Sequence, residues 1–592
     1  MSNKTKPTIE EIKELKALTR KHYSNLHSEF QTDEDYFNLD FLPDLGLPVA
    51  HAAEGTILPT GRDVIQTAKA HIDTTNPRVF VTAVGTGRAA EEEAEMRQKF
   101  YQGIAYRTMV ESPTSPFEAA VKNLCLYGLA GLKVVYDPDR WPDKPEKRDG
   151  ETGEDYSERM SNYEQQRHDA LPIVIVSVHP SALLFDPSYW HSAFVIECHS
   201  KLVLDISKRW PNWFNAEDKR PTDLVDYDEY WDEEWRSILI DGQPVLRGEV
   251  VRHKYGFMPY AIAYSGLGME TAANYPEHKA VGLLRYIRGV LASESRAYSI
   301  YDVVLKGTAW PVKAAEGDNA NLLTDFKLEY GTIQKLPPGV KLVDVISPPP
   351  TDALLGHLQY TNSIISASVA PRSVRGMAEP GVRSGYDRSL IIEKAELNFG
   401  VIKQAAEKLI AQALSMSSKV LERVVPGNVS VWAKTPVGDY DVEIKKDRIK
   451  GHLCSVEFRA VREEQEMRQS QNAQQLVAAG LISRDTARRK YLESIDAEGE
   501  EMKIDAEKIR NSPPVQEVLA QAIAQELAQA LGVRTQEQQM AGQRKGAGQP
   551  PPGIPGIPPR PPTMGSPEEV QQTLEAEVAT PPVSPAPPGM VA

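Results

Sequence analysis

The spacing of hydrophobic and polar residues predicts a chain that mixes helices and short strands. Residues 8 to 31 have the pattern of a charged, exposed helix, and the next helix is expected to end at Asn76-Pro77, just before a strand. Residues 171 to 200 contain runs of β-branched residues interrupted by prolines, which is typical of short strands. The expected fold class is therefore α+β.

The middle of the chain predicts a long helix, a small compact excursion and a returning helix. Residues 278 to 305 carry one apolar stripe at helical spacing, and residues 306 to 350 break into short strands and turns. Residues 351 to 369 then form the second helix, and residues 386 to 424 carry the longest helical pattern, which ends at Pro426-Gly427. The stripe of the first helix consists of Leu284, Ile287, Leu291, Tyr298, Tyr301 and Leu305.

A basic loop at residues 370 to 388 separates the returning helix from the longest one. Its glycines free the backbone and its prolines stiffen it, so we expect a shaped loop that can still move. Its four arginines indicate a negative partner nearby, although Glu379 and Asp387 reduce the net charge to +2. The glycines and arginines considered as site residues are Gly376, Gly381, Gly385, Arg372, Arg375, Arg383 and Arg388.

An acidic run between Asp223 and Glu234 contains seven carboxylates and no basic residue. Such a run could bind a divalent cation, but tyrosine and tryptophan alternate irregularly among the carboxylates. We favour a solvated or subunit-facing acidic surface over a metal site. Further along, Asp241-Gly242 predicts a β-hairpin turn.

Composition limits the function further. The 592 residues carry a formal net charge of -15, which argues against a protein that coats nucleic acid by bulk attraction. The three cysteines are far apart, so neither a disulfide framework nor a zinc site is expected. No apolar run reaches the roughly 20 residues of a membrane span, and no secretion signal is evident. Residues 550 to 592 hold 14 of the 44 prolines, and this tail is expected to be disordered.

The sequence contains no recognisable catalytic constellation. Residues 85 to 93 lack the lysine spacing of a phosphate-binding loop, and signatures of serine hydrolases, zinc proteases and zinc deaminases do not occur. His168, His179, His191 and His199 cluster only loosely. We therefore expect no enzyme, no cofactor and no metal. Scattered carboxylates could still meet in space, so a nucleic-acid enzyme with an acidic metal site remains one alternative.

Taken in order, several weak patterns resemble the portal proteins of tailed double-stranded DNA bacteriophages. They include "GLAGLKVVYDP", "VHPSALLFDP", "FMPYAIAYSGLG", "APRSVRGMAEPGVRSGYDRS" and "AAGLISRDTARRKYL". The resemblance spans about residues 20 to 500 and depends on order, length and spacing. It implies a homo-oligomeric ring of about twelve subunits at one capsid vertex, which conducts DNA. Another virion structural or adaptor protein is the second alternative.

The resemblance implies a division of the chain into the parts of a portal. Residues 1 to 277 would form the N-terminal part of the wing, followed by a stem helix, a clip, a second stem helix and a tunnel loop. The implied boundaries of these and the later parts are 278 to 305 (stem helix), 306 to 350 (clip), 351 to 369 (stem helix), 370 to 388 (tunnel loop), 389 to 460 (long helix and wing strands), 461 to 532 (helical crown) and 533 to 592 (proline-rich tail).

The resemblance also implies partners and contact residues. The partners would be double-stranded DNA bound without sequence preference, the large terminase subunit of the packaging motor, the major capsid protein with its scaffold, and the head-completion or tail adaptor protein; no membrane is involved. The protein would reside in the virion, after assembly in the host cytoplasm. The loop arginines would contact DNA in the channel or pair with a neighbouring subunit, and Arg285 and Arg288 have the same two possibilities. Lys335 and Lys341 would contact the motor or adaptor, or would simply be solvated.

Overall fold

The protein was analysed as a computed structural model, and every structural statement below concerns its described residues. These are residues 5–48, 55–74, 77–85, 88–187, 192–211, 213, 219–271, 275–309, 313–318, 320, 336, 338–344, 352–369, 385–435, 438–446, 449, 453–458, 463–484, 487, 504, 508 and 512. The chain divides into two compact units, Met1–Ala497 and Glu498–Ala592. Of the second unit only three residues are described, so residues 513 to 532 of the implied helical crown and the proline-rich tail lie outside the described residues.

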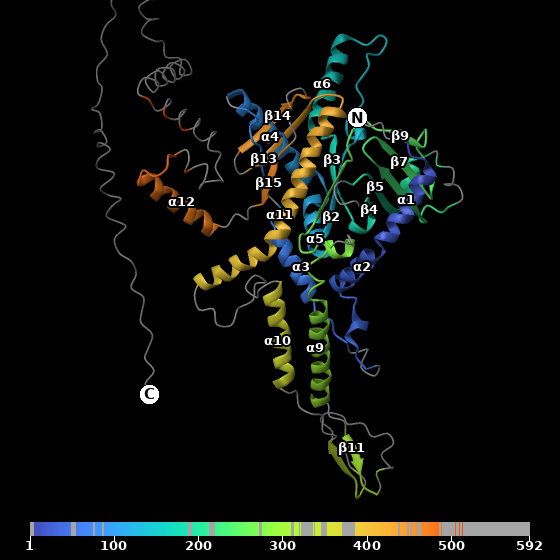
Figure 1. Ribbon diagram of the computed structural model, residues 1–592, viewed down its shortest axis with the longest axis vertical. Coiled ribbons are helices and arrows are strands. Elements are labelled where there is room, and N and C mark those ends of the chain that lie inside the picture. Colours follow the sequence, from blue (N-terminus) through green and yellow to red (C-terminus); the bar gives the residue numbers. More distant parts are fainter. Residues whose placement is uncertain are drawn as a thin grey trace, which may run out of the picture. The chain divides into compact units, whose positions relative to one another are not determined.

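Helices make up much of the first unit (Figure 1). The α-helices are α1 (Ile9–His22), α2 (Ser24–Asn38), α3 (Thr60–His71), α4 (Arg88–Glu111), α5 (Pro116–Tyr127), α6 (Gly153–Asp169), α7 (Val203–Arg209), α8 (Pro276–Lys279), α9 (Arg288–Ala309), α10 (Asp352–Ser368), α11 (Gly385–Arg423) and α12 (Glu463–Ala478). Short 3-10 helices are η1 (Leu42–Leu45), η3 (Pro138–Arg140) and η4 (Pro180–Ala182).

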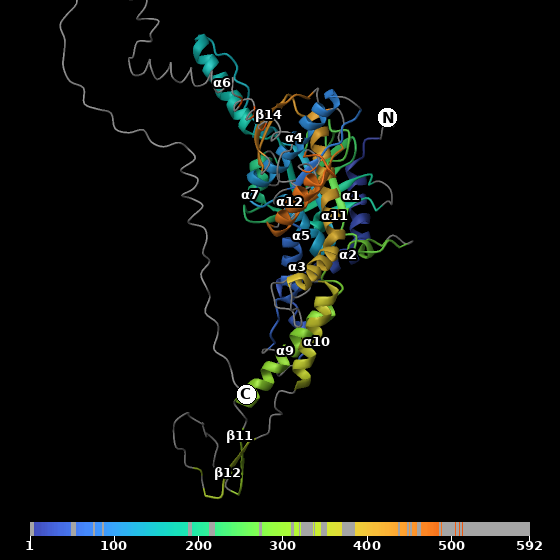
Figure 2. The same ribbon diagram turned by 90° about the vertical axis from the view of Figure 1, so that its left-hand side faces the viewer.

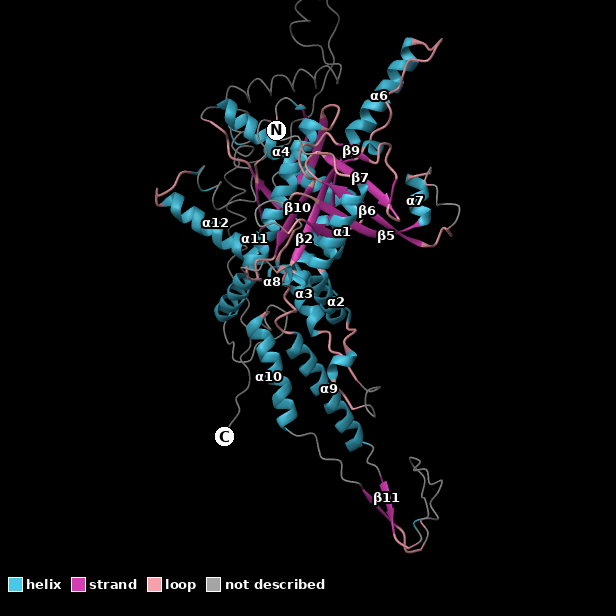
Figure 3. Cartoon of the chain, turned by 45° about the vertical axis from the view of Figure 1, so that its right-hand side comes forward, coloured by secondary structure: helices cyan, strands magenta, loops and turns pink. Residues whose placement is uncertain are grey.

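The strands form several small antiparallel sheets, which Figure 3 shows in magenta. The largest has the order β4-β5-β6-β7-β8, with β9 also paired to β7, and a second has the order β10-β2-β3. Two-stranded pairs are β1 with β15, β11 with β12, and β13 with β14. The bounds are β1 (Pro77–Phe80), β2 (Leu129–Tyr136), β3 (Ile173–Val178), β4 (Leu183–Phe185), β5 (Val195–Leu202), β6 (Leu224–Trp231), β7 (Trp235–Ile240), β8 (Gln243–Pro244), β9 (Val250–Arg252), β10 (Tyr260–Tyr264), β11 (Lys313–Glu316), β12 (Lys341–Asp344), β13 (Val429–Thr435), β14 (Gly438–Ile444) and β15 (Ser455–Phe458).

The α+β fold class is therefore confirmed, and α11 occupies the centre of the main core. Its buried face packs against α5, β2, β10 and β15. Leu409, Ile410, Ala413 and Leu414 on this face are completely buried. Four such residues within two turns match the regular spacing that predicted a long helix with one buried face.

The acidic run forms a partly buried strand, so the expected solvated or subunit-facing surface is wrong for Asp228 and Asp232, whereas three other carboxylates of the run are exposed. Residues 224 to 231 are β6, which lies between β5 and β7 in the largest sheet. Asp228 is buried and its Oδ2 lies 2.6 Å from Lys16 Nζ of α1. Asp232 is also buried and accepts a hydrogen bond of 3.0 Å from the Tyr230 hydroxyl. These carboxylates tolerate burial because each has a donor from the same chain.

Two predicted helix boundaries also differ from the structure. The N-terminal helix is interrupted at Tyr23, a buried residue whose ring packs against Phe185 with centroids 5.2 Å apart. The first of the two helices predicted in the middle of the chain is α9, which starts at Arg288 and not at residue 278. The preceding turn packs so closely on the end of α5 that a Cβ on Gly282 would lie 1.8 Å from the Leu126 carbonyl oxygen. This close approach holds the turn out of helical conformation.

The predicted hairpin at Asp241-Gly242 is confirmed. Both residues have positive φ angles, 49° and 72°, and Ile240 pairs with Gln243 across the turn. Such angles at both central positions are typical of the two-residue turn that joins antiparallel strands.

Candidate functional surface: the helix pair α9 and α10

Most of the predicted loop residues cannot be placed. Arg372, Arg375, Gly376, Gly381, Arg383 and Lys335 lie outside the described residues. Gly385 is the first residue of α11 and Arg388 lies in the first turn of that helix. The predicted loop 370 to 388 is therefore too long at its C-terminal end, because its last four residues are helical.

Lys341 lies in β12, within the predicted excursion, and its side chain is exposed. It stands opposite Glu316 of β11, while Lys313 stands opposite Asp344 at the other end of the two-strand ribbon. Opposite charges directly across an antiparallel pair favour this register. Lys341 is therefore exposed in the single chain, which both interpretations of this residue allow.

The two helices that flank this ribbon lie side by side and run in opposite directions (Figures 1 and 2). The Ser293 hydroxyl lies 3.2 Å from His357 Nε2, and Asn362 donates a hydrogen bond of 3.4 Å to Glu294. Ile365 is completely buried in this contact region. α9 and α10 are therefore a packed helix pair, as the sequence predicted for residues 278 to 305 and 351 to 369.

Large apolar side chains are exposed on both helices of this pair. Their exposed fractions are 39% for Tyr298, 42% for Ile300, 39% for Leu305, 41% for Leu355 and 64% for Tyr360. The apolar stripe of residues 278 to 305 is therefore buried only in its first half, at Leu284, Ile287 and Leu291. Solvent-exposed apolar residues that gather on one element indicate a surface that another molecule covers.

These apolar residues lie on two opposite faces of the helix pair. Successive residues of a helix are turned by about 100° around its axis. Measured from the side of α9 that contacts α10 through Ser293 and Glu294, Tyr298 and Leu305 lie about 80° to one side and Ile300 lies about 70° to the other side. On α10, Leu355 and Tyr360 are likewise separated to the two sides. Because the helices are antiparallel, face A contains Tyr298, Leu305 and Leu355, and face B contains Ile300 and Tyr360.

The start of α9 is attached to α2 by an ion-pair cluster. Arg288 donates to Asp33 Oδ1 at 2.9 Å and to Glu29 Oε2 at 2.6 Å, and Arg285 Nη2 lies 3.6 Å from Asp33 Oδ2. Both arginine side chains are only 16% exposed, and Asp33 is fully buried. These four residues, called the attachment cluster, pair the charges of Arg285 and Arg288 within the chain. Neither channel exposure nor pairing with a neighbouring subunit is therefore needed to explain these two arginines.

Residues 55 to 58 lie along the side of α9 and are bound there by two serines of that helix. The Ser299 hydroxyl accepts a hydrogen bond of 2.9 Å from the Thr56 amide, and the Ser295 hydroxyl accepts one of 3.1 Å from the Leu58 amide. Both serines are buried and lie one helical turn apart. The first half of α9 thus has its polar and apolar contacts supplied by its own chain.

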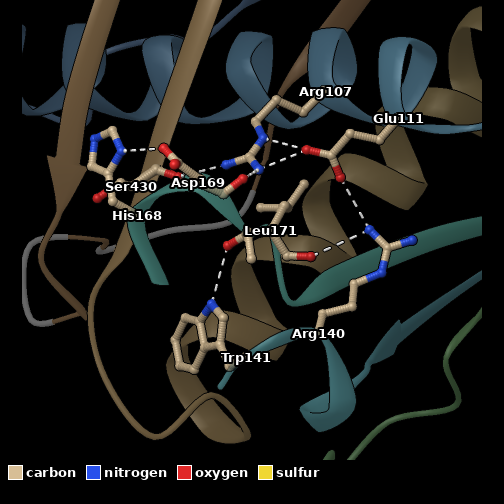
Figure 4. A network of polar contacts seen from close by, with 9 residues as sticks. Arg107, Glu111, Arg140, Trp141, His168, Asp169, Leu171 and Ser430 are labelled. Atoms are coloured by element: carbon tan, nitrogen blue, oxygen red, sulfur yellow. Dashed lines mark hydrogen bonds and ion pairs between the residues drawn. The ribbon is translucent and has the colours of Figure 1, made fainter. Parts of the chain in front are cut away.

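A second polar network, shown in Figure 4, fixes the base of α6. The Arg107 side chain is completely buried and donates to Glu111 (2.7 Å) and to the carbonyl oxygens of Asp169 (2.6 Å) and Ser430 (3.2 Å). Arg140 donates to the other oxygen of Glu111 at 3.1 Å. This network ties α4, the end of α6 and β13 together, whereas α6 itself has no buried residue. The surface insertion predicted for residues 138 to 170 is confirmed.

A third buried network joins the two larger sheets. Lys133 of β2 donates to Glu197 of β5 at 2.8 Å and to Glu229 of β6 at 2.7 Å. Burial alone would lower the pKa of Lys133, but the two carboxylates raise it above its ordinary value. Burial would likewise raise the pKa of Glu197, but the hydrogen bond with His199 and the charge of Lys133 hold it below its usual range. The network keeps ionised groups in fixed positions between the sheets.

Three of the four histidines that cluster loosely in the sequence are described, and each has a polar partner within the chain. His199 Nε2 lies 2.6 Å from Glu197, His168 Nε2 lies 2.9 Å from Asp441, and His179 Nε2 lies 3.0 Å from the Tyr127 hydroxyl. His191 lies outside the described residues. Within the part of the chain that the structure describes, no three His, Cys, Asp or Glu side chains gather in a way that could hold a metal ion. No described helix combines the length and apolar character needed to cross a membrane.

The sequence reasoning missed the attachment cluster and both buried networks. Lys133 could have been noticed, because it interrupts the apolar run of residues 129 to 135, where a buried cation needs carboxylate partners. Nothing in the local sequence distinguishes Arg107 from an exposed helical arginine. Its burial depends on β13, which lies more than 300 residues further along the chain.

Comparison with known proteins leaves these observations to stand alone. No protein-family model and no curated protein matches this chain.

Proposed function

We propose that this protein is a portal protein of a tailed double-stranded DNA bacteriophage, which assembles into a ring and conducts DNA during packaging and ejection. The observation that carries the proposal is the helix pair α9 and α10, with apolar residues on both of its faces. In the proposed ring this pair is the stem, β11 and β12 belong to the clip, and the segment before α11 is the tunnel loop. The clip docks the packaging motor and later the head-completion or tail proteins.

The two apolar faces favour a ring over a simple dimer. A two-fold dimer uses the same patch on both subunits and would cover one face only. If face A of one copy packs against face B of the next, every copy contacts two neighbours, and a rotation that closes gives a ring. The exposed side chains are then buried without a second kind of protein.

Charge supports a passage through which DNA slides. The net charge of -15 per chain disfavours tight adhesion of the duplex to the ring. Contacts from a few loop arginines to phosphates would be weak and independent of sequence, so they can form and break as the duplex advances. This division of charge fits a conduit better than a protein that holds DNA in place.

Electron microscopy of the purified full-length chain, combined with its native mass, tests this proposal. Rings with a central hole, at a mass that is a multiple of 65.7 kDa, are expected. Closed dimers or a stable monomer would contradict the proposal. A monomer that cleaves DNA in the presence of magnesium would favour the alternative of a nucleic-acid enzyme.

A further inference from the structure

The helix α6, called the arm below, is anchored at one end and contains no buried residue. Its anchors lie at the base, where Arg107 donates to the Asp169 carbonyl oxygen at 2.6 Å (Figure 4) and Arg167 donates to the Asn428 carbonyl oxygen at 3.1 Å. At about 1.5 Å per residue the 17 residues extend roughly 25 Å from this base, and Figures 1 and 3 show the arm leaving the sheets. A surface helix normally buries an apolar face, so an anchored helix without a buried residue indicates contact with another molecule.

The far end of the arm is acidic on its outer side. Tyr156, Met160 and Tyr163 are half-buried and recur at helical spacing, so they mark the inner side of the helix. Glu154 and Glu158 are exposed, lie one turn apart and point about 160° away from that side. Both arginines of the helix lie on the inner side. The outer side therefore presents negative charge without a cation of its own.

A basic patch lies at the C-terminal end of α11, near the base of the arm. Lys419 Nζ and Arg423 Cζ lie 5.5 Å and 5.9 Å from the centre of the Phe257 ring. Arg423 also donates to the carbonyl oxygen of Tyr255, the residue after Lys254, at 3.0 Å. Lys446 donates to the Val425 carbonyl oxygen at 3.3 Å, three residues before Asn428. The basic patch is defined as Lys254, Lys419, Arg423 and Lys446.

The positive charge of this patch is not neutralised by ion pairs. Among the described residues, none of its four cations lies within ion-pair distance of a carboxylate. The end of α11 carries a partial negative charge that favours nearby cations, and Glu422 beside Arg423 offsets one of the four charges. The remainder is a local excess of positive charge in a chain whose net charge is -15. Such an excess indicates an acidic partner.

We propose that the arm of one copy docks on the basic patch of a second copy, with Glu154 and Glu158 against the patch. Within one chain the patch lies near the base of the arm, so the acidic end does not reach it. Between copies, each chain gives one arm and receives another, and such a head-to-tail contact repeats around a ring.

This inference rests on the proposed assembly of copies, but it uses surfaces other than face A and face B. Contacts between exposed charges are weak and are screened by salt. Such contacts guide association and fix its register more than they add affinity. The arm is therefore expected to strengthen an assembly that faces A and B hold together, and not to join two copies without them.

Carbodiimide cross-linking, which joins carboxylates to amines in direct contact, tests the location of this contact. Unlabelled and isotope-labelled full-length chains are mixed before assembly. Peptides that contain Glu154 or Glu158 should be joined to peptides that contain Lys254 or Lys419, and the links should include pairs of one labelled and one unlabelled chain. Rings without such links, or with links inside one chain only, would overturn this inference and leave the portal proposal standing. A chain that does not assemble would contradict both.

Charge reversal tests whether the contact matters for assembly. Glu154→Lys with Glu158→Lys should lower the salt concentration at which the assemblies dissociate, and Lys254→Glu with Lys419→Glu should do the same. The four changes together restore opposite charges at the contact, so they should restore the wild-type salt resistance. Native mass measured along a salt series gives the result.

The matched control is Glu10→Lys with Glu14→Lys, the same change at two exposed residues one turn apart near the start of α1. This variant should dissociate at the same salt concentration as the wild type. Failure of the fourfold variant to regain salt resistance would overturn the proposal. A patch variant that assembles like the wild type but no longer binds duplex DNA would also overturn it, because the patch would then serve DNA.

Discussion

The two halves of α9 differ in where their contacts come from. The half that begins at Arg288 is bound to its own chain by the attachment cluster, by Ser295 and by Ser299. The other half carries Ile300 and Leu305, which are about two-fifths exposed. Between Arg288 and Ser299 the only exposed large apolar side chain is Tyr298, next to the boundary, so the internal contacts of this half leave little apolar surface for another molecule. The second half is therefore better explained by contact with another copy than by the fold of one chain.

The largest effect on a single chain is expected from Arg288→Met, at the attached end. This change leaves Asp33 buried without its main donor, and removal of one partner of a buried ion pair costs about 3–5 kcal/mol. The free energy of unfolding should be measured in urea at pH 8, where Asp33 is ionised. Lys306→Met, at an exposed ion pair of the same helix, is the control and should cost less than about 1 kcal/mol. Equal losses in both variants would contradict the difference between the two halves.

A smaller effect is expected from the serines that bind residues 55 to 58. Ser295→Ala and Ser299→Ala each remove a hydroxyl that accepts a backbone amide, and a lost hydrogen bond of this kind costs about 1 kcal/mol. Urea unfolding gives the loss, and hydrogen exchange at Thr56 and Leu58 shows whether the contact itself has opened. Ser293→Ala, two residues before Ser295 and at an exposed contact, should change neither quantity appreciably. Unchanged exchange in the two buried variants would refute the assigned contact.

Substitutions in the exposed half should hardly affect the single chain. Ile300→Ser and Leu305→Ser replace apolar groups that are already in contact with water, so the free energy of unfolding of the monomer should change by less than about 0.5 kcal/mol. Assembly should nevertheless weaken, which sedimentation of the same samples can detect. A loss above 2 kcal/mol in the monomer would mean that this half belongs to the core.

Substitutions in the proposed tunnel loop should change neither the stability of the chain nor its assembly. Arg375→Ala with Arg383→Ala removes two charges that the proposed function assigns to phosphate contacts. Rings should form as in the wild type, but packaging or retention of DNA in a complementation assay should fall. Normal phage yield from the double variant would refute a required role for these side chains.

The sequence predicted those parts of the fold whose signals are local. α3, α5 and α11 and most strands follow from periodicity and from proline or glycine at their ends. The start of α9 could not be predicted, because it is set by the packing of Gly282 on Leu126, more than 150 residues earlier. The burial of Asp228 also depends on a distant partner, Lys16. The helix pair was predictable, whereas the exposure of its second half became visible only from the contacts that surround it.

The most direct test of the central claim uses one variant on each face of the helix pair. Leu355→Glu alters face A and Tyr360→Glu alters face B, while Ser363→Glu adds the same charge at an exposed residue on the side of α10 turned away from α9, as the control. If face A of one copy packs on face B of the next, each variant alone should be monomeric, because neither homogeneous sample retains both faces. A mixture of the two should give a heterodimer and nothing larger, whereas the control should form rings.

Native mass spectrometry of these four samples reports the result in one experiment. Monomers from the single variants, heterodimers from the mixture and rings from the control are the result that the account predicts. Wild-type-sized rings from either single variant, or homodimers that persist in one variant only, would contradict the packing of face A against face B.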